Sequence, residues 1–112
     1  MPLTADDLDG HSLTRRYDDG TFVRLAIRRT GSEAYPSGWR YALHYGATGP
    51  DAVDGPTLDD GTIRRYDNAH EDTKGHERHV APDPDPETIE FPGMVSLYER
   101  FWDEIPKRSV GP

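Results

Sequence analysis

The sequence contains no cysteine, which excludes a disulfide framework and a thiolate that acts as nucleophile or metal ligand. It has no apolar run near the roughly 20 residues that a membrane-spanning helix needs, and we expect no membrane partner. Its first residues lack the basic and apolar regions of a signal peptide, so we expect the protein in the cytoplasm. At 112 residues the chain is too short for two independent cores, and we expect a single domain over residues 1–112.

Lysine is nearly absent too, since Lys74 and Lys107 are the only two. Asp and Glu number 21 against 13 Lys and Arg, for a net charge of −8, and Asp outnumbers Glu. This balance is typical of halophiles that accumulate salt, and it suggests a haloarchaeal protein; an ordinary acidic protein is the alternative. At molar salt the Debye length is about 3 Å, so the acidic total does not exclude RNA as a partner.

What the sequence does contain is a series of alternating apolar and polar positions, which predicts β-strands. The expected strands are Ser12–Tyr17, Thr21–Arg29, Trp39–Tyr45 and Ile63–Asp67. An Asp-Asp-Gly-Thr run leads into the second strand and again into the fourth, and Asp-Gly is a hairpin signal because glycine accepts positive φ. We therefore expect an antiparallel sheet over residues 11–67. The polar residues 1–10 before it are expected to be a flexible lead.

The last third of the chain predicts a loop and then a helix. Residues 68–90 are polar and rich in proline, so we expect a histidine-rich loop followed by an extended spacer. Residues 92–105 predict a helix, because apolar side chains recur at helical spacing from Met94 to Ile105 and Pro106 stops it. A helix this short needs tertiary packing. The sequence thus predicts an α+β fold: an antiparallel meander of about four strands with a C-terminal helix packed on one face.

The uncovered face of that sheet is expected to carry basic side chains. It would hold Arg24, Arg28, Arg40 and His44. Such arginines either pair with the abundant acids or contact phosphates. The facing of the fourth strand stays open, because either Ile63 or Tyr66 can set its buried side, and the two choices expose different arginines.

Histidine is concentrated in one segment, where His70, His76 and His79 lie within ten residues. Imidazole gives and takes protons near neutral pH. Such a cluster beside arginines suits cleavage of a phosphodiester, with one ring as base and another as acid. The same side chains could instead ligate zinc or manganese. A third interpretation is a solvated loop whose histidines only cap turns or pair with neighbouring acids.

The run Arg65-Tyr66-Asp67-Asn68-Ala69, followed by Gly75-His76-Glu77-Arg78-His79, resembles the TumE family of prokaryotic toxins. In that family a strand ends in Arg-(Trp/Tyr)-Asp-Asn-Ala-Pro-His, and a paired-histidine segment, an acidic spacer and a C-terminal helix follow. Tyr41-Ala42-Leu43-His44 resembles the family's upstream Tyr-x-Tyr-His motif. Three features depart from the pattern: Leu43 stands in place of the second aromatic residue, His70 stands in place of proline, and the histidines are more widely spaced.

The resemblance implies a toxin of a type II toxin–antitoxin pair, neutralised by an antitoxin that is expected to be a small helix-turn-helix protein. With RNA as the expected substrate, the predicted catalytic residues are His44, Arg65, Asp67, His76 and His79. The residues predicted to bind RNA are Arg24, Arg28, Arg40 and Arg64. No cofactor and no metal is expected. The alternatives are a non-catalytic interaction module and a metal-dependent enzyme that uses His70, His76 and His79.

Overall fold

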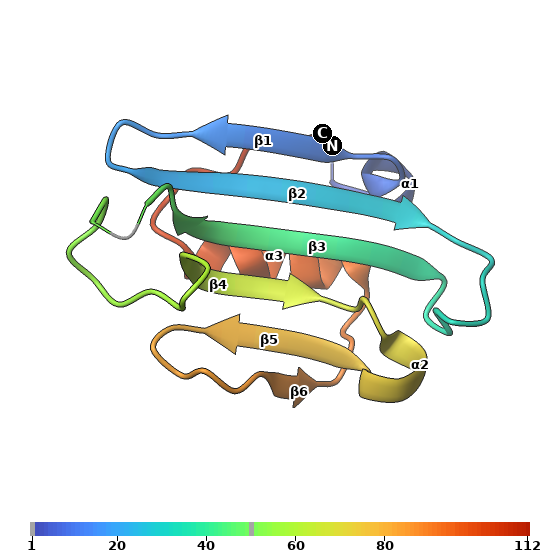
Figure 1. Ribbon diagram of the computed structural model, residues 1–112. Helices are drawn as coiled ribbons and strands as arrows, with labels where there is room; N and C mark the ends of the chain where they lie inside the picture. Colours follow the sequence, from blue (N-terminus) through green and yellow to red (C-terminus); the bar gives the residue numbers. More distant parts are fainter. Residues whose placement is uncertain (1, 50) are drawn as a thin grey trace.

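The structure, a computed structural model, describes residues 2–49 and 51–112. In these residues six antiparallel strands form a sheet in the order β1-β2-β3-β4-β5-β6, so each strand pairs with its neighbours in sequence (Figure 1). The strands are β1 (Ser12–Arg16), β2 (Thr21–Arg29), β3 (Trp39–Ala47), β4 (Thr62–Asp67), β5 (His76–Val80) and β6 (Glu87–Ile89). The helices are α1 (Ala5–Leu8), α2 (Glu71–Lys74) and α3 (Met94–Glu104). No helix within the described ranges is long and apolar enough to cross a membrane.

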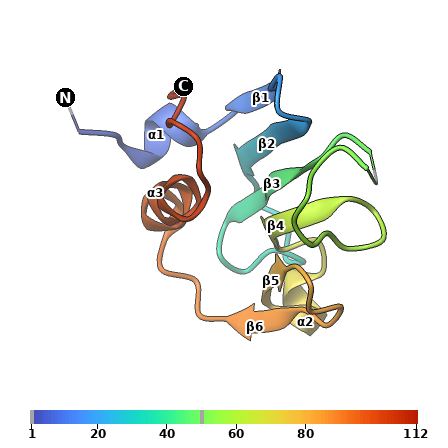
Figure 2. The ribbon, with the colours of Figure 1, turned by 90° about the vertical axis from the view of Figure 1, so that its left-hand side faces the viewer.

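One face of the sheet is covered by α3, with α1 beside that helix, and we call the other side the open face (Figure 2). The covered face takes the apolar half of the alternating pattern: Val23, Leu25 and Ile27 of β2 are each at most 3% exposed. Leu97 and Phe101 of α3 are fully buried in the same cluster. Burying a large apolar side chain stabilises a fold by about 1.5–3 kcal/mol. Packing on the sheet therefore supplies the stability that a helix as short as α3 lacks alone.

The predicted α+β fold with an antiparallel sheet and a C-terminal helix is confirmed, but the sheet has six strands in place of about four. The two additional strands, β5 and β6, lie in residues 68–90, which we expected to be loop and spacer. β5 carries polar side chains on both faces, so it lacks the apolar period that marks a strand in a sequence. It is held instead by backbone pairing with β4 on one side and β6 on the other.

Residues 1–10, expected to be a flexible lead, include the helix α1; Met1 lies outside the described residues. Thr4 and Asp7 form a capping box, in which the amide of each donates a hydrogen bond to the side chain of the other. Leu8, at the end of α1, is fully buried in the core. The lead is therefore anchored to the core by Leu8, with Leu3 and Ala5 packed against the same cluster, which its polar composition does not predict.

A bulge decides how β4 faces. The register against β3 shifts after Tyr45, which pairs with Arg64, so Ile63 is an extra residue on β4. Ile63 and Arg64 both line a cavity on the helix-covered face, and Tyr66 is fully buried on that side. Both apolar residues that could have set the buried side of β4 thus point the same way, and Arg65 is left on the open face.

Candidate functional site

A row of four polar side chains crosses the open face of the sheet. The strand register places Arg24 beside His44, His44 beside Arg65, and Arg65 beside His79. Neighbouring strands lie about 4.8 Å apart, so this open-face row is roughly 14 Å long. The two histidines are separated by the strand that carries Arg65, and a guanidinium group therefore lies between two imidazoles.

Asp67 fixes the β4–β5 half of the open-face row. Its Oδ2 accepts a hydrogen bond from Arg65 Nε at 2.9 Å and lies 3.2 Å from His79 Nε2. Arg65 Nη2 is in turn 3.3 Å from His79 Nε2. Asp67 is only 9% exposed. Because charge-assisted hydrogen bonds are strong and directional, this carboxylate holds Arg65 and His79 in fixed relative positions.

His44, which is half-buried, lies in the other half of the row. Its Nε2 is 2.8 Å from Thr62 Oγ1, and its ring meets the Phe22 ring edge-on at a centroid distance of 5.0 Å. Burial, reinforced by the Arg65 guanidinium beside it, lowers the pKa of His44 from 6.5 to about 4. His44 is therefore neutral at pH 7, a state in which an imidazole can accept a proton.

A groove runs along the open face beside this row. The next row of the register is Ala26, Ala42, Asp67 and Glu77. Two cavities of about 510 and 350 Å³ share Ala26, Ala42, Asp67 and Ala69 as lining residues, so they are parts of one open-face groove. The two small side chains Ala26 and Ala42 form its floor. One end is lined by Arg24, His44 and Arg65, and the other end by Arg28 and Arg40.

Three arginines of the groove are free to bind an anion. Arg24, Arg28 and Arg40 are exposed and make no ion pair with any described residue, although the chain carries 21 acids. Arg28 stands directly opposite Arg40 on the neighbouring strand. Like charges in directly opposite positions destabilise a sheet, and an anion bound between them relieves that repulsion.

His76, predicted to be exposed and catalytic, does not join the open-face row. It lies on the helix-covered face, where its ring stacks on the rings of Phe91 at 4.4 Å and Tyr41 at 5.7 Å. The Tyr41 hydroxyl is 2.7 Å from His76 Nδ1, and Glu71 Oε1 is 3.1 Å from Nε2. Burial lowers the pKa of His76. Strand residues three positions apart face opposite sides, which is why His76 and His79 diverge.

Arg64 and His70 also lie away from the groove. Arg64 Nη1 is 3.3 Å from Glu104 Oε2 on the helix-covered face, so Arg64 does not share a face with the three arginines beside which we expected it to act. The bulge in β4 is the physical reason. His70 is exposed at the start of α2, where its side chain makes no capping hydrogen bond.

Among the described residues, the side chains grouped closely enough to hold a metal ion differ from the predicted set of His70, His76 and His79. Asp67, Glu77 and His79 each offer one ligand atom, and these three atoms all lie within 4.8 Å of one another. An imidazole and two carboxylates suit zinc or manganese. Arg65, however, already contacts Asp67 and His79, so a positive charge is present in this cluster without a metal.

Sequence reasoning missed the part played by Asn68, which is fully buried directly after β4. Its Nδ2 donates to the carbonyl of Trp39 at 2.7 Å and to Glu71 Oε1 at 2.9 Å, and its Oδ1 accepts from the amide of Tyr41 at 3.0 Å. Its side chain thus satisfies backbone groups of β3 where β4 stops. An asparagine at a strand end is the signal for such a role, because its short amide readily bonds to backbone.

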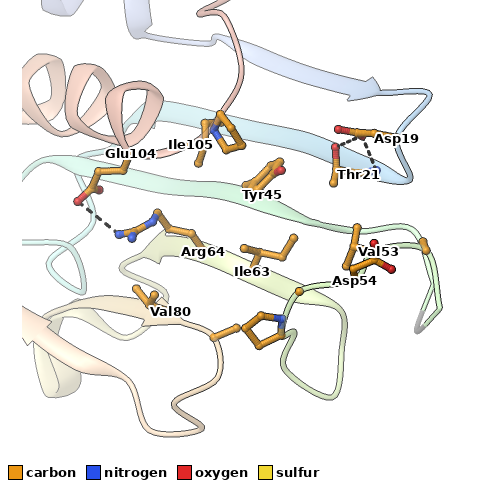
Figure 3. Close-up of a pocket in the computed structure, with 15 residues that line it drawn as sticks. Asp19, Thr21, Tyr45, Val53, Asp54, Ile63, Arg64, Val80, Glu104 and Ile105 are labelled. Carbon is orange, nitrogen blue, oxygen red and sulfur yellow. Dashed lines mark hydrogen bonds and ion pairs between the residues drawn. The ribbon is translucent and has the colours of Figure 1, made fainter.

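A cavity of about 570 Å³ lies on the other side of the sheet, near the end of α3 (Figure 3). Tyr45, Ile63 and Val80 form an apolar wall, and the ion pair of Arg64 with Glu104 borders it. None of its lining residues is a histidine, and it lies on the face opposite the open-face row. We therefore place the candidate chemistry in the open-face groove.

Comparison with known proteins identifies the family of the chain. A family model described as Toxin TumE matches residues 6–109, nearly the whole chain, and the match includes the complete open-face row together with Asp67. No curated protein matches the chain, and no solved structure matches it either. A toxin of this kind implies an antitoxin partner. The chain belongs to the TumE family of toxins.

Proposed function

We propose that this toxin cleaves RNA at the open-face row. The observation that carries the proposal is the strand register that gathers Arg24, His44, Arg65 and His79 on the uncovered face. Cleavage of a phosphodiester needs a base, an acid and positive charge at the phosphate. A guanidinium between two imidazoles offers all three, and the groove beside them offers arginines that pair with no acid among residues 2–49 and 51–112.

In the proposed reaction His44 is the general base, because it is neutral at pH 7. It takes the proton of a ribose 2′-hydroxyl, whose oxygen attacks the adjacent phosphorus. His79 gives a proton to the departing 5′-oxygen, and the products are a 2′,3′-cyclic phosphate and a free 5′-hydroxyl. Arg65 stabilises the negative charge on the phosphate. Asp67 orients His79, as a carboxylate does in other histidine sites.

The RNA backbone on either side of the cleaved bond would be held by Arg24, Arg28 and Arg40. All three are exposed on the open face. Arg64 has no part in this proposal, since it lies on the other face with Glu104. The groove is thus a local basic surface on a chain whose net charge is −8.

Replacing His79 with Ala tests the proposal. A general acid contributes about 100- to 10,000-fold to a rate, so His79→Ala should slow RNA cleavage by the purified toxin at least about 100-fold. The same variant should relieve growth arrest when the chain is expressed in a host. His70→Ala is the matched control, because His70 is an exposed histidine outside the groove. A folded His79→Ala protein that cleaves RNA like the wild type would show that the row is not catalytic.

The cluster of Asp67, Glu77 and His79 favours a second candidate, a metal-dependent nuclease. In that case a divalent ion would supply the charge at the phosphate that Arg65 supplies in the first reaction. RNA cleavage after treatment with EDTA separates the two. Unchanged cleavage supports the histidine reaction, whereas loss of cleavage that manganese or zinc restores supports the second candidate.

The antitoxin is proposed to cover the open-face groove with an acidic segment, because opposite charges across an interface favour association. We expect the partner to be a small helix-turn-helix protein encoded beside the toxin. Co-expression and affinity capture test this. Wild-type toxin and His79→Ala should retain the partner, whereas Arg28→Glu combined with Arg40→Glu should lose it. Failure of folded wild-type toxin to retain the product of the adjacent gene would contradict the proposal.

A further inference from the structure

An arginine lies over an aromatic ring at each end of the open-face groove. At one end the guanidinium carbon of Arg24 is 5.6 Å from the centre of the Phe22 ring. At the other end that of Arg40 is 5.7 Å from the centre of the Tyr35 ring. The Tyr35 hydroxyl donates to the carbonyl of Ala69 at 3.3 Å, and Ala69 lines the groove. Both ends therefore combine positive charge with a π-surface.

The floor between these two ends carries small side chains. Ala26 and Ala42 are cross-strand partners there. Arg24 and Arg28, on either side of Ala26, are four residues apart on β2 and thus about 13 Å apart along the strand. That length accommodates roughly two nucleotides of an extended chain. A flat base can lie on an alanine floor, where a longer side chain would block it.

We propose that the open-face groove is a subsite for single-stranded RNA. Unpaired bases lie on the alanine floor between the two arginine–aromatic pairs, and Arg28 with Arg40 binds a phosphate roughly two nucleotides from the cleaved one. The inference rests on the proposed cleavage of RNA and names its substrate class. An RNA duplex does not fit, because its bases are stacked inside and cannot reach the floor.

Arg28 and Arg40 are the residues best placed to select this substrate. They face each other directly across β2 and β3 and have no acidic partner among the described residues. Two guanidinium groups can bind one phosphate through several hydrogen bonds. Their mutual repulsion is highest in the free protein, so a phosphate between them also removes an unfavourable interaction.

Binding measurements with the His79→Ala protein test the subsite while the RNA stays intact. The probes are a fluorescent single-stranded RNA oligonucleotide and the same strand annealed to its complement. The single strand should bind at least about tenfold more tightly than the duplex. Arg28→Ala and Arg40→Ala should each weaken single-strand binding several-fold and lower the salt slope of the affinity by about 1. Arg108→Ala, which removes an exposed arginine that does not line the groove, should change neither quantity.

Tyr35 allows a second, independent test. The Tyr35 ring lies under the Arg40 guanidinium and fixes its position, so Tyr35→Ala should weaken single-strand binding several-fold. Tyr35→Phe keeps the ring and loses only the hydroxyl, and it should bind like the parent protein.

Two results would overturn the subsite: equal affinity for single strand and duplex, or unchanged affinity in both Arg28→Ala and Arg40→Ala. The proposed cleavage fails separately. If wild-type toxin binds the single strand with these dependences but does not cut it, the subsite stands and the cleavage proposal is wrong.

Discussion

Two adjacent residues at the end of β4, Asp67 and Asn68, face different ways and make different contacts. Asp67 faces the groove and holds Arg65 and His79, whereas Asn68 turns inward and bonds to the backbone of β3. Both belong to the run of residues that carries the family resemblance. This motif therefore contains one side chain that contacts Arg65 and His79 in the groove and another that bonds to the neighbouring strand.

Asn68→Ala should lower the free energy of unfolding by about 1–3 kcal/mol, because it leaves the amide of Tyr41 without a partner and the Trp39 carbonyl with only the 3.4 Å hydrogen bond from Ser37 Oγ. Urea unfolding followed by circular dichroism measures this. Asp72→Ala, at an exposed position of α2, should stay within about 0.5 kcal/mol of the wild type. An Asn68→Ala protein as stable as the wild type would show that water satisfies the freed groups.

The pKa of His44, lowered from 6.5 to about 4 by burial, links stability to pH. Between these two values the unfolded chain binds more protons than the folded one, so stability should fall as the pH drops from 6.5 towards 4. Burial also lowers the pKa of His11 and His76, which act in the same direction. Urea unfolding at pH 7 and pH 5 should show a smaller loss for His44→Gln than for the wild type. Equal losses would mean that His44 protonates freely in the folded state.

At the scale of elements, the sequence predicted β2, β3, β4 and α3 from apolar positions that face the core, and β1 from the Asp-Gly hairpin signal between it and β2. β5 was hidden for a physical reason. His76 is a polar residue on the covered side, so β5 shows no apolar alternation in the sequence. The His76 ring can be buried there because Tyr41 and Glu71 contact its two nitrogens. Once β5 is known to be a strand, its period of two puts His79 on the open face and His76 on the other. The placement of His76 away from the other predicted site residues therefore follows from the missed strand.

The covered side of β5 depends on Phe91, which follows β6 and stacks on His76 at 4.4 Å and on Tyr41 at 5.9 Å. Phe91→Ala should lower the free energy of unfolding by about 1–3 kcal/mol through lost ring contacts. Phe91→Tyr keeps the ring and should lose much less. RNA cleavage per folded molecule should not change, because Phe91 lies on the face opposite the groove. A loss of cleavage in folded Phe91→Ala would mean that the covered face of β5 positions the catalytic row.

Across the whole molecule, charge is distributed unevenly. The open-face groove holds Arg24, Arg28 and Arg40, for which the described part of the chain offers no ion pair, while the chain as a whole has a net charge of −8. The remaining surface must therefore be strongly acidic. A local basic groove in an acidic surface favours binding of a polyanion in the groove and disfavours its binding elsewhere. The net charge of the sequence does not reveal this uneven distribution.

The same excess of acids should make folding depend on salt. Self-repulsion of a net charge of −8 destabilises the compact state when it is unscreened. Raising potassium chloride from about 0.1 M to about 1 M shortens the Debye length from about 10 Å to about 3 Å, so the melting temperature should rise over this range. The measurement is made without RNA, since salt also weakens binding to phosphates.

A variant with fewer acids separates this charge effect from a general effect of salt on apolar burial. Asp18→Asn combined with Glu99→Gln removes two exposed carboxylates for which the described residues show no ion pair. Its melting temperature should be higher than that of the wild type at low salt, and the difference should shrink at high salt. Melting temperatures that do not change with salt in either protein would contradict the halophilic interpretation, because the acids would then be held apart well enough to need no screening.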